Sequence, residues 1–475
     1  MSTSPLDSPA AARPPAPLWL IPLVVAAALF MENMDAAVIA TSLPAIAADL
    51  GEDPVILKLA FTAYLVSMAI FIPVSGWCGD RFGARRVFQA AIAVFTLASI
   101  GCAMSTSLNE LVAARALQGM GGAMMVPVGR LIILRAVPKA GLVQALAWLT
   151  VPALVGPVIG PPLGGFITTY FHWRWIFWIN VPVGLIGIAL AALYMPPGRG
   201  RHPGPLDWLG FLLSGFGVSS LIFGFTIAGR EVLPEPMAKV LMIAGAVLIA
   251  AYVVHARRAR APLIDLRLLA VPTFLTSVGG GFLFRVGGGA IPFLLPLMLQ
   301  LAFGLDPFAS GSLTFVAAAG AMAMKFTAGP ILRRFGFRRV LTVNALICAG
   351  FMAVYGLFTV ATPHWLILAA LLTGGFFRSL QFTSLNAVAY ADVDEAEMSQ
   401  ATALAAVTQQ LALAIGVALA AFMLESARAV RAEETLVQQD FAVTFFGLAV
   451  LVGAAAFFHA RLSAVAGAEV SGHRA

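Results

Sequence analysis

The sequence predicts an all-α integral membrane protein with fourteen transmembrane helices, and three observations support this prediction. Hydrophobic residues make up 60% of the chain, only 11% of residues are charged, and the mean hydropathy is +0.93. A soluble domain carries roughly 25% charged residues, because its surface must face water. The apolar residues also form stretches of about 20, the length that a helix needs to cross a hydrocarbon core about 30 Å thick.

Fourteen such stretches follow one another along the chain. They are 18–42, 55–75, 87–106, 109–134, 142–168, 174–195, 206–228, 237–255, 270–300, 308–330, 339–360, 364–389, 400–424 and 440–460. The ninth is long enough to tilt or to break. Twelve crossing helices with two re-entrant segments are the alternative count.

The signatures of other protein classes are missing from the sequence. The net charge of +7 comes from short loops rather than from a basic stripe with interleaved aromatics, so nucleic-acid binding is not expected. Cys78, Cys102 and Cys348 are scattered singly, without disulfide or metal-ligand spacing. We find no Gly-x-x-x-x-Gly-Lys-Ser/Thr loop and no Ser/His/Asp cluster, which argues against ATP-driven transport and against an enzyme.

The Lys and Arg residues of the loops predict the orientation of the chain. With the N-terminus inside the cell, nineteen of the 29 Lys and Arg residues lie in cytoplasmic segments and four lie within spans. The outer set has six members: Lys58, Arg174, Arg230, Lys239, Arg428 and Arg431. Both termini are therefore expected to be cytoplasmic, with residues 1–17 and 463–475 as tails.

An internal repeat divides the chain into two halves. The loop 76–86 shares its Gly, Arg-Phe-Gly and Arg-Arg positions with the loop 329–339, at an offset of 253 residues. We therefore expect two parallel six-helix bundles, 18–195 and 261–462, with two helices inserted between them at 196–260. Parallel repeats with a site at their interface are a known plan for transporters.

Six charged residues fall in the interior of the predicted spans, away from the ends of the spans. A charge at a helix centre costs about 2.5–3.5 kcal/mol on insertion scales, so each needs a partner or a water-filled cavity. The six are Glu32, Asp35, Arg115, Arg285, Lys325 and Arg378. Glu32 and Asp35 share one helix face. Asp35 and Arg115 lie at a similar depth in their helices, which predicts an ion pair; a static pair that stabilises packing is the alternative to a role in transport.

The three cations of the second half lie beside glycines. Gly287 follows Arg285 closely, and Gly375 precedes Arg378. Glycine permits close packing or local unwinding, as at transporter sites. Arg285, Lys325 and Arg378 are thus candidates for a substrate cavity. They could also pair with the two acids across that cavity, or serve only as structural pairs.

The loop 76–86 resembles the signature loop of the major facilitator superfamily, and its second copy has Arg333 at the acidic position. Four further stretches agree. The stretch 111–119 resembles the fourth-helix motif of that superfamily, and 156–165 resembles the fifth-helix motif associated with antiporters. The stretches 34–44 and 173–184 resemble motifs of its fourteen-helix drug:proton antiporters. Within this group the run 114–131 is most similar to transporters of the MdtD type.

This resemblance implies the major facilitator fold and export of amphipathic drugs in exchange for protons by alternating access. Asp35 and Arg115, together with Glu32, are the implied proton-coupling residues. The implied gating loop, which latches the halves in the outward-facing state, comprises Gly76, Asp80, Arg81, Gly83 and Arg130. The implied antiporter motif, a bend that limits leakage, comprises Gly156, Pro157, Gly160, Pro161, Gly164 and Gly165. Tight helix packing is the alternative for these small residues.

The proton gradient is the expected energy source, with no cofactor and no metal. The expected partners are membrane lipid, protons and a small-molecule substrate, and accessory export proteins are considered as well. The expected location is the cell inner membrane. The six charged residues inside the spans comprise four cations and two acids. This excess of positive charge motivates an alternative function, the export of a small organic anion or metabolite. A channel or sensor is a third class, and the lack of an added soluble domain counts against a sensor.

Overall fold

The computed structural model describes residues 20–136, 142–196, 204–227, 235–259, 262–325, 327–394, 397–431, 435–471 and 473. Every regular element within these ranges is helical, which confirms the all-α prediction. The N-terminal tail predicted at 1–17 and the outer-loop cation Arg230 lie outside the described residues.

The helices fall into three consecutive sets. The first set is α1 (Leu20–Leu50), α2 (Lys58–Phe82), α3 (Ala84–Met104), α4 (Leu108–Ala136), α5 (Leu142–Tyr170), α6 (Trp175–Trp178) and α7 (Asn180–Tyr194). The second set is α8 (Trp208–Ile227) and α9 (Glu235–Arg258). The third set is η2 (Leu266–Ala270), α10 (Pro272–Leu275), η3 (Thr276–Gly280), α11 (Gly281–Leu297), η4 (Met298–Ala302), α12 (Pro307–Met324), α13 (Ala328–Gly356), α14 (His364–Ala389), α15 (Met398–Arg431), α16 (Gln438–His459) and α17 (Ala468–Ser471).

The described residues provide the fourteen predicted crossings. Twelve helical segments are long and apolar enough to cross a membrane, with α6–α7 and α10–η4 each counted as one crossing. The 29-residue α5 and the shorter apolar helix α8 bring the total to fourteen. The predicted ninth span, 270–300, is interrupted by the π-helical turns η3 and η4 on either side of α11.

The ends of several helices extend past the apolar stretches. The α1 helix continues to Leu50, whereas the predicted span ended at 42, and α15 continues to Arg431 rather than to 424. The prediction counted only the residues that cross the hydrocarbon core. Helical hydrogen bonding continues beyond them into the polar interface. The α1 helix ends before Gly51, whose φ of 69° is not helical.

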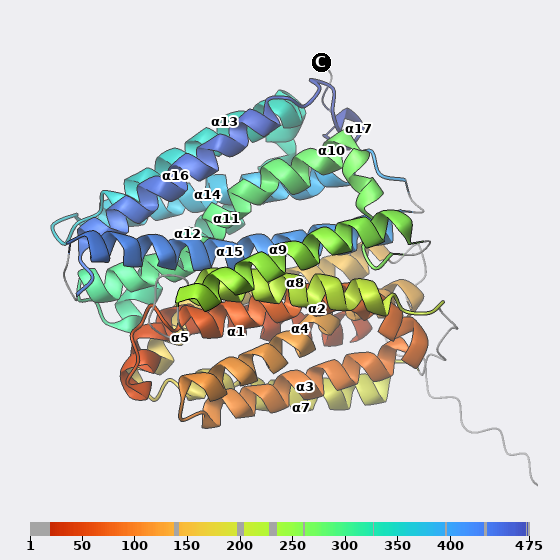
Figure 1. The fold of residues 1–475 in the computed structure, drawn as a ribbon, viewed down its shortest axis with the longest axis horizontal. Helices are drawn as coiled ribbons and strands as arrows, with labels where there is room; N and C mark the ends of the chain where they lie inside the picture. The colour runs from red at the N-terminus through yellow and green to blue at the C-terminus, as the bar shows by residue number, and fades with distance from the viewer. Residues whose placement is uncertain are drawn as a thin grey trace, which may run out of the picture.

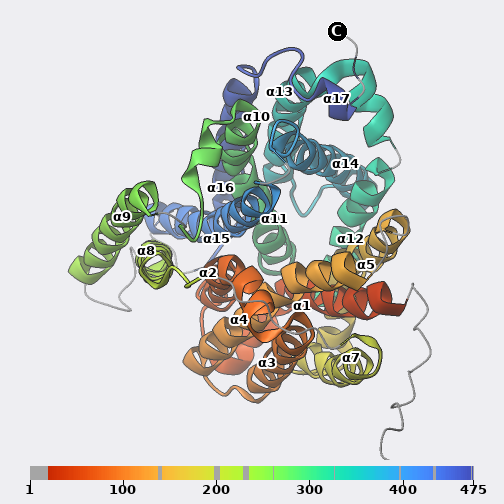
Figure 2. The ribbon, with the colours of Figure 1, turned by 90° about the vertical axis from the view of Figure 1, so that its right-hand side faces the viewer.

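The helix axes run roughly parallel along the bundle, as Figure 1 shows. Seen end-on in Figure 2, helices α1–α5 and α7 form one group and helices α10–α17 form a second group. The two groups meet through α2 against α15, α5 against α12 and α1 against α11. The pair α8–α9 lies at the side of the bundle, where α8 packs against α2 and α15.

Two glycines at equivalent positions of the sequence repeat both adopt a positive φ. Gly83 separates α2 from α3 with φ at 90°, and Gly336, which is 253 residues later, bends α13 with φ at 69°. Residues with a side chain rarely adopt positive φ, because the Cβ crowds the backbone. The segments 76–86 and 329–339 therefore both need glycine at this equivalent position.

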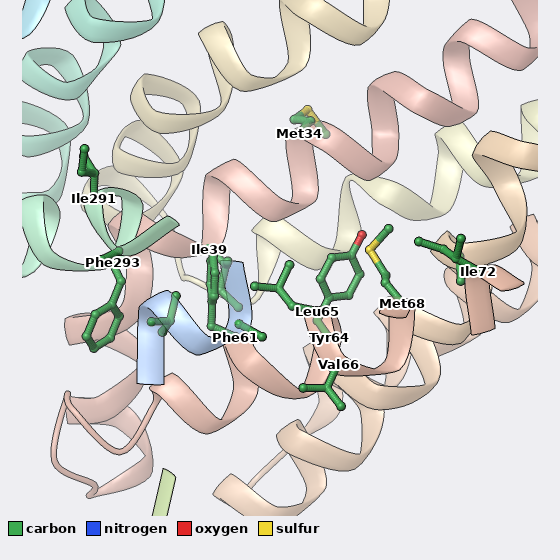
Figure 3. Packing of buried hydrophobic residues seen from close by; sticks show 14 of the residues in the cluster. Met34, Ile39, Phe61, Tyr64, Leu65, Val66, Met68, Ile72, Ile291 and Phe293 are labelled. Atoms are coloured by element: carbon green, nitrogen blue, oxygen red, sulfur yellow. The ribbon is translucent and has the colours of Figure 1, made fainter. Parts of the chain in front are cut away.

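One apolar core runs through both groups of helices. Figure 3 shows part of it, with Ile39 of α1 and Phe61 of α2 in the same cluster as Ile291 and Phe293 of α11. The two halves thus bury apolar surface against each other, besides the surface that each buries internally.

The glycines of the antiporter motif pack α5 closely against α1. A Cβ on Gly156 would lie 3.1 Å from the backbone nitrogen of Met34, and one on Gly164 would lie 2.6 Å from the carbonyl oxygen of Val38. A Cβ on Gly160 would overlap the Cβ of Ala37. The four-residue spacing thus leaves a smooth strip on which α1 rests.

The opposite side of the same motif faces the second half. A Cβ on Gly165 would overlap the carbonyl oxygen of Pro307 in α12, and one on Gly311 would overlap the carbonyl oxygen of Pro161. Helix α5 continues without a break through Pro157 and Pro161. The motif therefore holds α5 between α1 and α12.

Replacing Gly160 by Ala should lower the melting temperature of the purified protein, because the added methyl group has no space against Ala37. Overpacking of this kind costs about 1–3 kcal/mol. The matched control is Gly350→Ala in α13, where nothing lies within 4 Å of the new Cβ and stability should stay equal or rise. Equal melting temperatures for the two variants would contradict the packing role of Gly160.

Candidate functional site

Asp35 of α1 and Arg115 of α4 form a buried ion pair. The Nη1 atom of Arg115 donates to Oδ2 of Asp35 at 2.5 Å, and the two side chains are 0% and 1% exposed. The structure thus brings together the two residues whose shared depth in their helices suggested a pair. A buried charge pair is stable only when further hydrogen bonds satisfy the remaining polar atoms.

Three polar side chains complete the surroundings of Asp35. Gln118, one turn after Arg115 on α4, donates through Nε2 to Oδ1 of Asp35 at 2.9 Å. Asn180, the first residue of α7, donates to the same oxygen at 2.8 Å. Ser99 of α3 accepts from Gln118 at 2.8 Å and from Asn180 at 3.3 Å. The carboxylate of Asp35 therefore connects α1 to α4 and α7.

Arg115 keeps unused donors although it is fully buried. Its guanidinium lies 4.3 Å from the ring centroid of Tyr64 and 6.0 Å from that of Phe177, positions in which aromatic faces attract a cation. Within the described residues, its Nε and Nη2 atoms have no hydrogen-bond partner. Arg115 can therefore offer hydrogen bonds to a further group while it remains paired with Asp35.

Glu32 lies one turn before Asp35 on the same side of α1. Its side chain is buried, and its Oε2 atom has no hydrogen-bond partner among the described residues. A Cβ built on Gly122 of α4 would lie 3.2 Å from the Tyr64 hydroxyl and 3.8 Å from the Glu32 carboxyl carbon. The absence of a side chain at Gly122 thus leaves space between these two polar groups.

In the second half, Arg285 and Lys325 reach the same face of α14. Arg285 of α11 is buried and donates to the carbonyl oxygen of Ser277 at 2.9 Å and to Oδ1 of Asn386 at 3.0 Å. Lys325, just after α12, donates to Thr383 at 2.8 Å. Thr383 and Asn386 are three residues apart, so the two cations flank one side of α14.

Arg378 occupies a separate position on α14. It lines a cavity of about 20 Å³ together with Tyr355 and Cys348 of α13. This volume suits a single water molecule and is much smaller than a drug-sized site. The structure therefore does not place Arg378 with Arg285 and Lys325 around one large cavity.

A buried polar cluster near Arg285 was not expected from the sequence. Gln381 of α14 accepts from Asn344 at 2.9 Å and donates to the carbonyl oxygen of Leu341 at 3.0 Å. Its Nε2 atom lies 3.4 Å from Nδ1 of His459, whose ring is 0% exposed. These residues join α13, α14 and α16, and no charge or spacing pattern singles them out in the sequence.

The gating-loop residues lie at one end of the bundle. Asp80 is half-buried at the end of α2, whereas Arg81 and Arg130 are exposed. Arg130 is close enough to Glu32 of α1 and to Tyr390 beside α14 for its charge to act on both. Gly83, between α2 and α3, has a positive φ. At Gly76 no atom lies within 4 Å of the position that a Cβ would occupy.

The other end of the bundle is closed by ion pairs between the halves. Lys58, which starts α2 and is 2% exposed, contacts Glu425 of α15 with 3.1 Å between Nζ and Oε1. Asp53 lies 3.1 Å from Arg428 of the same helix. Gln300 of η4 donates to the carbonyl oxygen of Thr41 at 2.9 Å.

Sequence reasoning missed these pairs because their partners are 367 and 375 residues apart. Gln118 and Asn180 are different, since both lie inside stretches that carry the family resemblance. The resemblance therefore marks both, whereas their neutral side chains lack the charge that identified Asp35 and Arg115.

A further polar cluster anchors the pair α8–α9. Asp207, which precedes α8, accepts from the backbone nitrogens of Gly210 at 2.8 Å and Leu263 at 3.1 Å and lies 2.8 Å from Nε2 of His255. Although partial burial acts to raise the pKa of Asp207, these hydrogen bonds hold it below the ordinary value. The anionic form of Asp207 therefore joins α8 and α9 to the segment before α10.

Among the described residues, no group of three or more His, Cys, Asp or Glu side chains is arranged to hold a metal ion.

Comparison with known proteins gives the family. The sequence model of the Major Facilitator Superfamily matches residues 25–417 and again 277–470, and the second match starts close to the offset of the internal repeat. A relative from Pectobacterium carotovorum subsp. carotovorum (strain PC1) is 37% identical over 407 residues, covering 86% of each chain. A relative from Escherichia fergusonii is 36% identical over 451 residues, covering 94% of each. Both are named, provisionally, as multidrug resistance protein MdtD.

Solved structures share the fold at low identity. A crystal structure of a D-xylose–proton symporter has a TM-score of 0.68 at 15% identity, covering 94% of this chain and 97% of the other. An autoinhibited peptide transporter of the POT family has a TM-score of 0.67 at 16% identity, with the same coverage. The chain belongs to the major facilitator superfamily and is a multi-pass membrane protein.

Replacing Glu425 by Gln should favour conformations in which the end of the bundle with the Lys58 pair is open. The change removes a carboxylate that attracts a buried ammonium across the two halves. A cysteine placed at Thr41, in a background without the three native cysteines, should then react severalfold faster with a membrane-impermeant maleimide.

The matched control is Arg431→Gln. Arg431 pairs with Asp440 at 2.6 Å, but both residues belong to the second half, so labelling at Thr41 should not change. Equal labelling rates in the parent and Glu425→Gln proteins would show that the pair does not hold the halves together.

Proposed function

We propose that this major facilitator is a proton-coupled antiporter that exports amphipathic drugs or related compounds by alternating access. The names of its relatives, which refer to multidrug resistance, support this substrate class. We assign it no enzymatic activity. The one observation that carries proton coupling is the Asp35 carboxylate, buried and shared among Arg115, Gln118 and Asn180.

The geometry suits a carboxylate that exchanges a guanidinium for a proton. When Asp35 is ionised, its charge is balanced by Arg115 in a site without water contact. Protonation removes that attraction, and Arg115 then retains Gln118 and the Tyr64 ring as partners. The change redistributes hydrogen bonds among α1, α4 and α7, and this coupling would favour one conformation over the other.

The proposed location is the cell inner membrane, with both termini in the cytoplasm, as the loop charges predict. The loop from Gly76 to Arg86 then lies at the cytoplasmic end, where Asp80, Arg81 and Arg130 are proposed to latch the outward-facing state. The pair of Lys58 and Glu425 lies at the outer end and closes it. Because one end must be closed while the other opens, the two sets of contacts would stabilise opposite states.

The proposed energy source is the proton gradient, without a cofactor. The proposed partners are membrane lipid, protons and a small-molecule substrate, with accessory export proteins as a further candidate; no nucleic acid is involved. We retain the division into bundles at 18–195 and 261–462 with an insertion at 196–260.

Asp35→Asn should abolish transport driven by a pH gradient, because an amide cannot exchange a proton at this site. The assay is drug-dependent proton flux in proteoliposomes. Asp35→Glu, which keeps a titratable group, should retain reduced coupling and shows whether a charge at this position is compatible with folding.

The control is Asp49→Asn, which changes an acid of the same helix that pairs with Arg174 near the helix end. Its flux should remain at the wild-type level. Wild-type flux in monodisperse Asp35→Asn protein would refute proton coupling by Asp35.

A specific observation favours a second candidate, the export of a small organic anion or metabolite. Arg285 and Lys325 flank one face of α14, and among the described side chains the Nε atom of Arg285 is buried without a hydrogen-bond partner. Two cations at one face suit a carboxylate or phosphate group.

Two variants distinguish the two substrate classes by equilibrium binding. For a cationic drug, Glu32→Gln should weaken binding and Arg285→Gln should have little effect. For an organic anion, Arg285→Gln should weaken binding by about 1.5–3 kcal/mol, the size of a charge-assisted hydrogen bond, and Glu32→Gln should have little effect. Loss of both ligands in both variants would assign the two residues to folding.

A further inference from the structure

A groove lies on the outside of the first half, between the ends of α2 and α3 and the middle of α4. Its volume is about 360 Å³, within the range of sites that hold small organic molecules. Phe82 of α2, Ala90 and Val94 of α3 and Met124 of α4 form its apolar lining, and Arg86 of α3 is its one charged lining residue.

Small residues make this surface concave. Ala90 on α3 and Gly121 on α4 leave space where larger side chains would fill it. A Cβ on Gly121 would lie 2.8 Å from the carbonyl oxygen of Ala91 and 2.7 Å from the backbone nitrogen of Phe95. The backbones of α3 and α4 thus touch at the floor of the groove, which separates it from the buried Asp35 site.

The groove opens toward the membrane. Leu97 of α3 and Leu117 of α4 are 67% and 53% exposed and continue the helix faces that carry Val94 and Met124. Figure 2 shows α3 on the side of the first half that faces away from the second half. In a bilayer, the large apolar side chains exposed on this side would face lipid chains.

The length of the groove matches one leaflet of a bilayer. From Arg86 to Val94 the helical rise is about 12 Å, at about 1.5 Å per residue. Half of a hydrocarbon core is about 15 Å thick. Arg86 lies in the first turn of α3, so its charge is at headgroup depth while Val94 lies well inside the leaflet.

Arg86 has the charge that an anionic headgroup requires. Its neighbour Arg85 donates to the carbonyl oxygens of Met195 at 3.0 Å and Ala192 at 2.6 Å. Arg85 thus caps the C-terminal end of α7. Arg86 is exposed and faces the groove instead. A guanidinium binds a phosphate group through paired hydrogen bonds.

We propose that this groove binds an anionic phospholipid of the cytoplasmic leaflet, with one acyl chain along Ala90 and Val94 and its phosphate on Arg86. The proposal rests on the membrane orientation given under the proposed function, which places the start of α3 on the cytoplasmic side. That leaflet carries anionic lipid, and basic pockets at helix ends bind such headgroups. The bound lipid would brace the end of α2 that carries Asp80 and Arg81.

The test is photolabelling of the full-length protein in nanodiscs with phosphatidylglycerol that carries a diazirine in one acyl chain. Wild-type protein should be labelled within residues 87–94 or 117–124, and phosphatidylcholine with the same chain should label there at least fivefold less. Arg86→Gln should reduce the phosphatidylglycerol labelling roughly tenfold, to the phosphatidylcholine level. Ala90→Phe, which fills the groove from an exposed position, should reduce labelling by both lipids.

The matched control is Arg339→Gln, the exposed arginine that the internal repeat places at the equivalent position of the second half; it should label like wild type. Equal labelling by the two lipids, or unchanged labelling in Arg86→Gln, would overturn the proposal. Competition by a transported drug would also overturn it, because the groove would then belong to the substrate path. Labelling requires no transport, so Asp35→Asn should label normally even if the proposed antiport is wrong.

Discussion

A charge buried among apolar helices has no water to solvate it, and much of this structure follows from that constraint. Arg115 is fully buried, so its charge carries a desolvation cost. The carboxylate of Asp35 and the ring of Tyr64, which both lie against its guanidinium, offset that cost. Asp35 in turn needs Gln118 and Asn180 for its second oxygen. Three helices, α1, α4 and α7, are thereby joined at one carboxylate.

The halves are held by two kinds of contact with different consequences. Glycine contacts such as that of Gly165 with α12 bring backbones together without any charge, and they permit sliding or separation of rigid helices. The pair of Lys58 and Glu425 is electrostatic and located at one end only. Because the interface is apolar along its length and has this ion pair at one end, opening that end would break the pair while most of the core stays buried.

The sequence was sufficient for the helices, for the repeat and for the Asp35–Arg115 pair, for physical reasons. Hydrocarbon thickness fixes span length, and insertion energy makes each intramembrane charge conspicuous. Neutral polar residues such as Gln381 and Asn344 carry a much smaller penalty, so nothing in the sequence marks their cluster with His459. The ion pairs between the halves, Lys58 with Glu425 and Asp53 with Arg428, could not be predicted from the sequence. A charged residue near the end of a span can face solvent or a partner, and only the fold decides which.

The two halves differ in the charges that they bury, although they share the sequence repeat. The first half buries Asp35 against Arg115, with the buried Glu32 one turn away on α1. The second half buries Arg285 among neutral groups, the carbonyl of Ser277 and the amide of Asn386. A carboxylate beside a guanidinium can exchange one cationic partner for a proton, while an arginine side chain has no comparable proton to exchange near neutral pH. The proposed proton exchange therefore fits the residues of the first half, and the buried cation of the second half fits the second candidate substrate class.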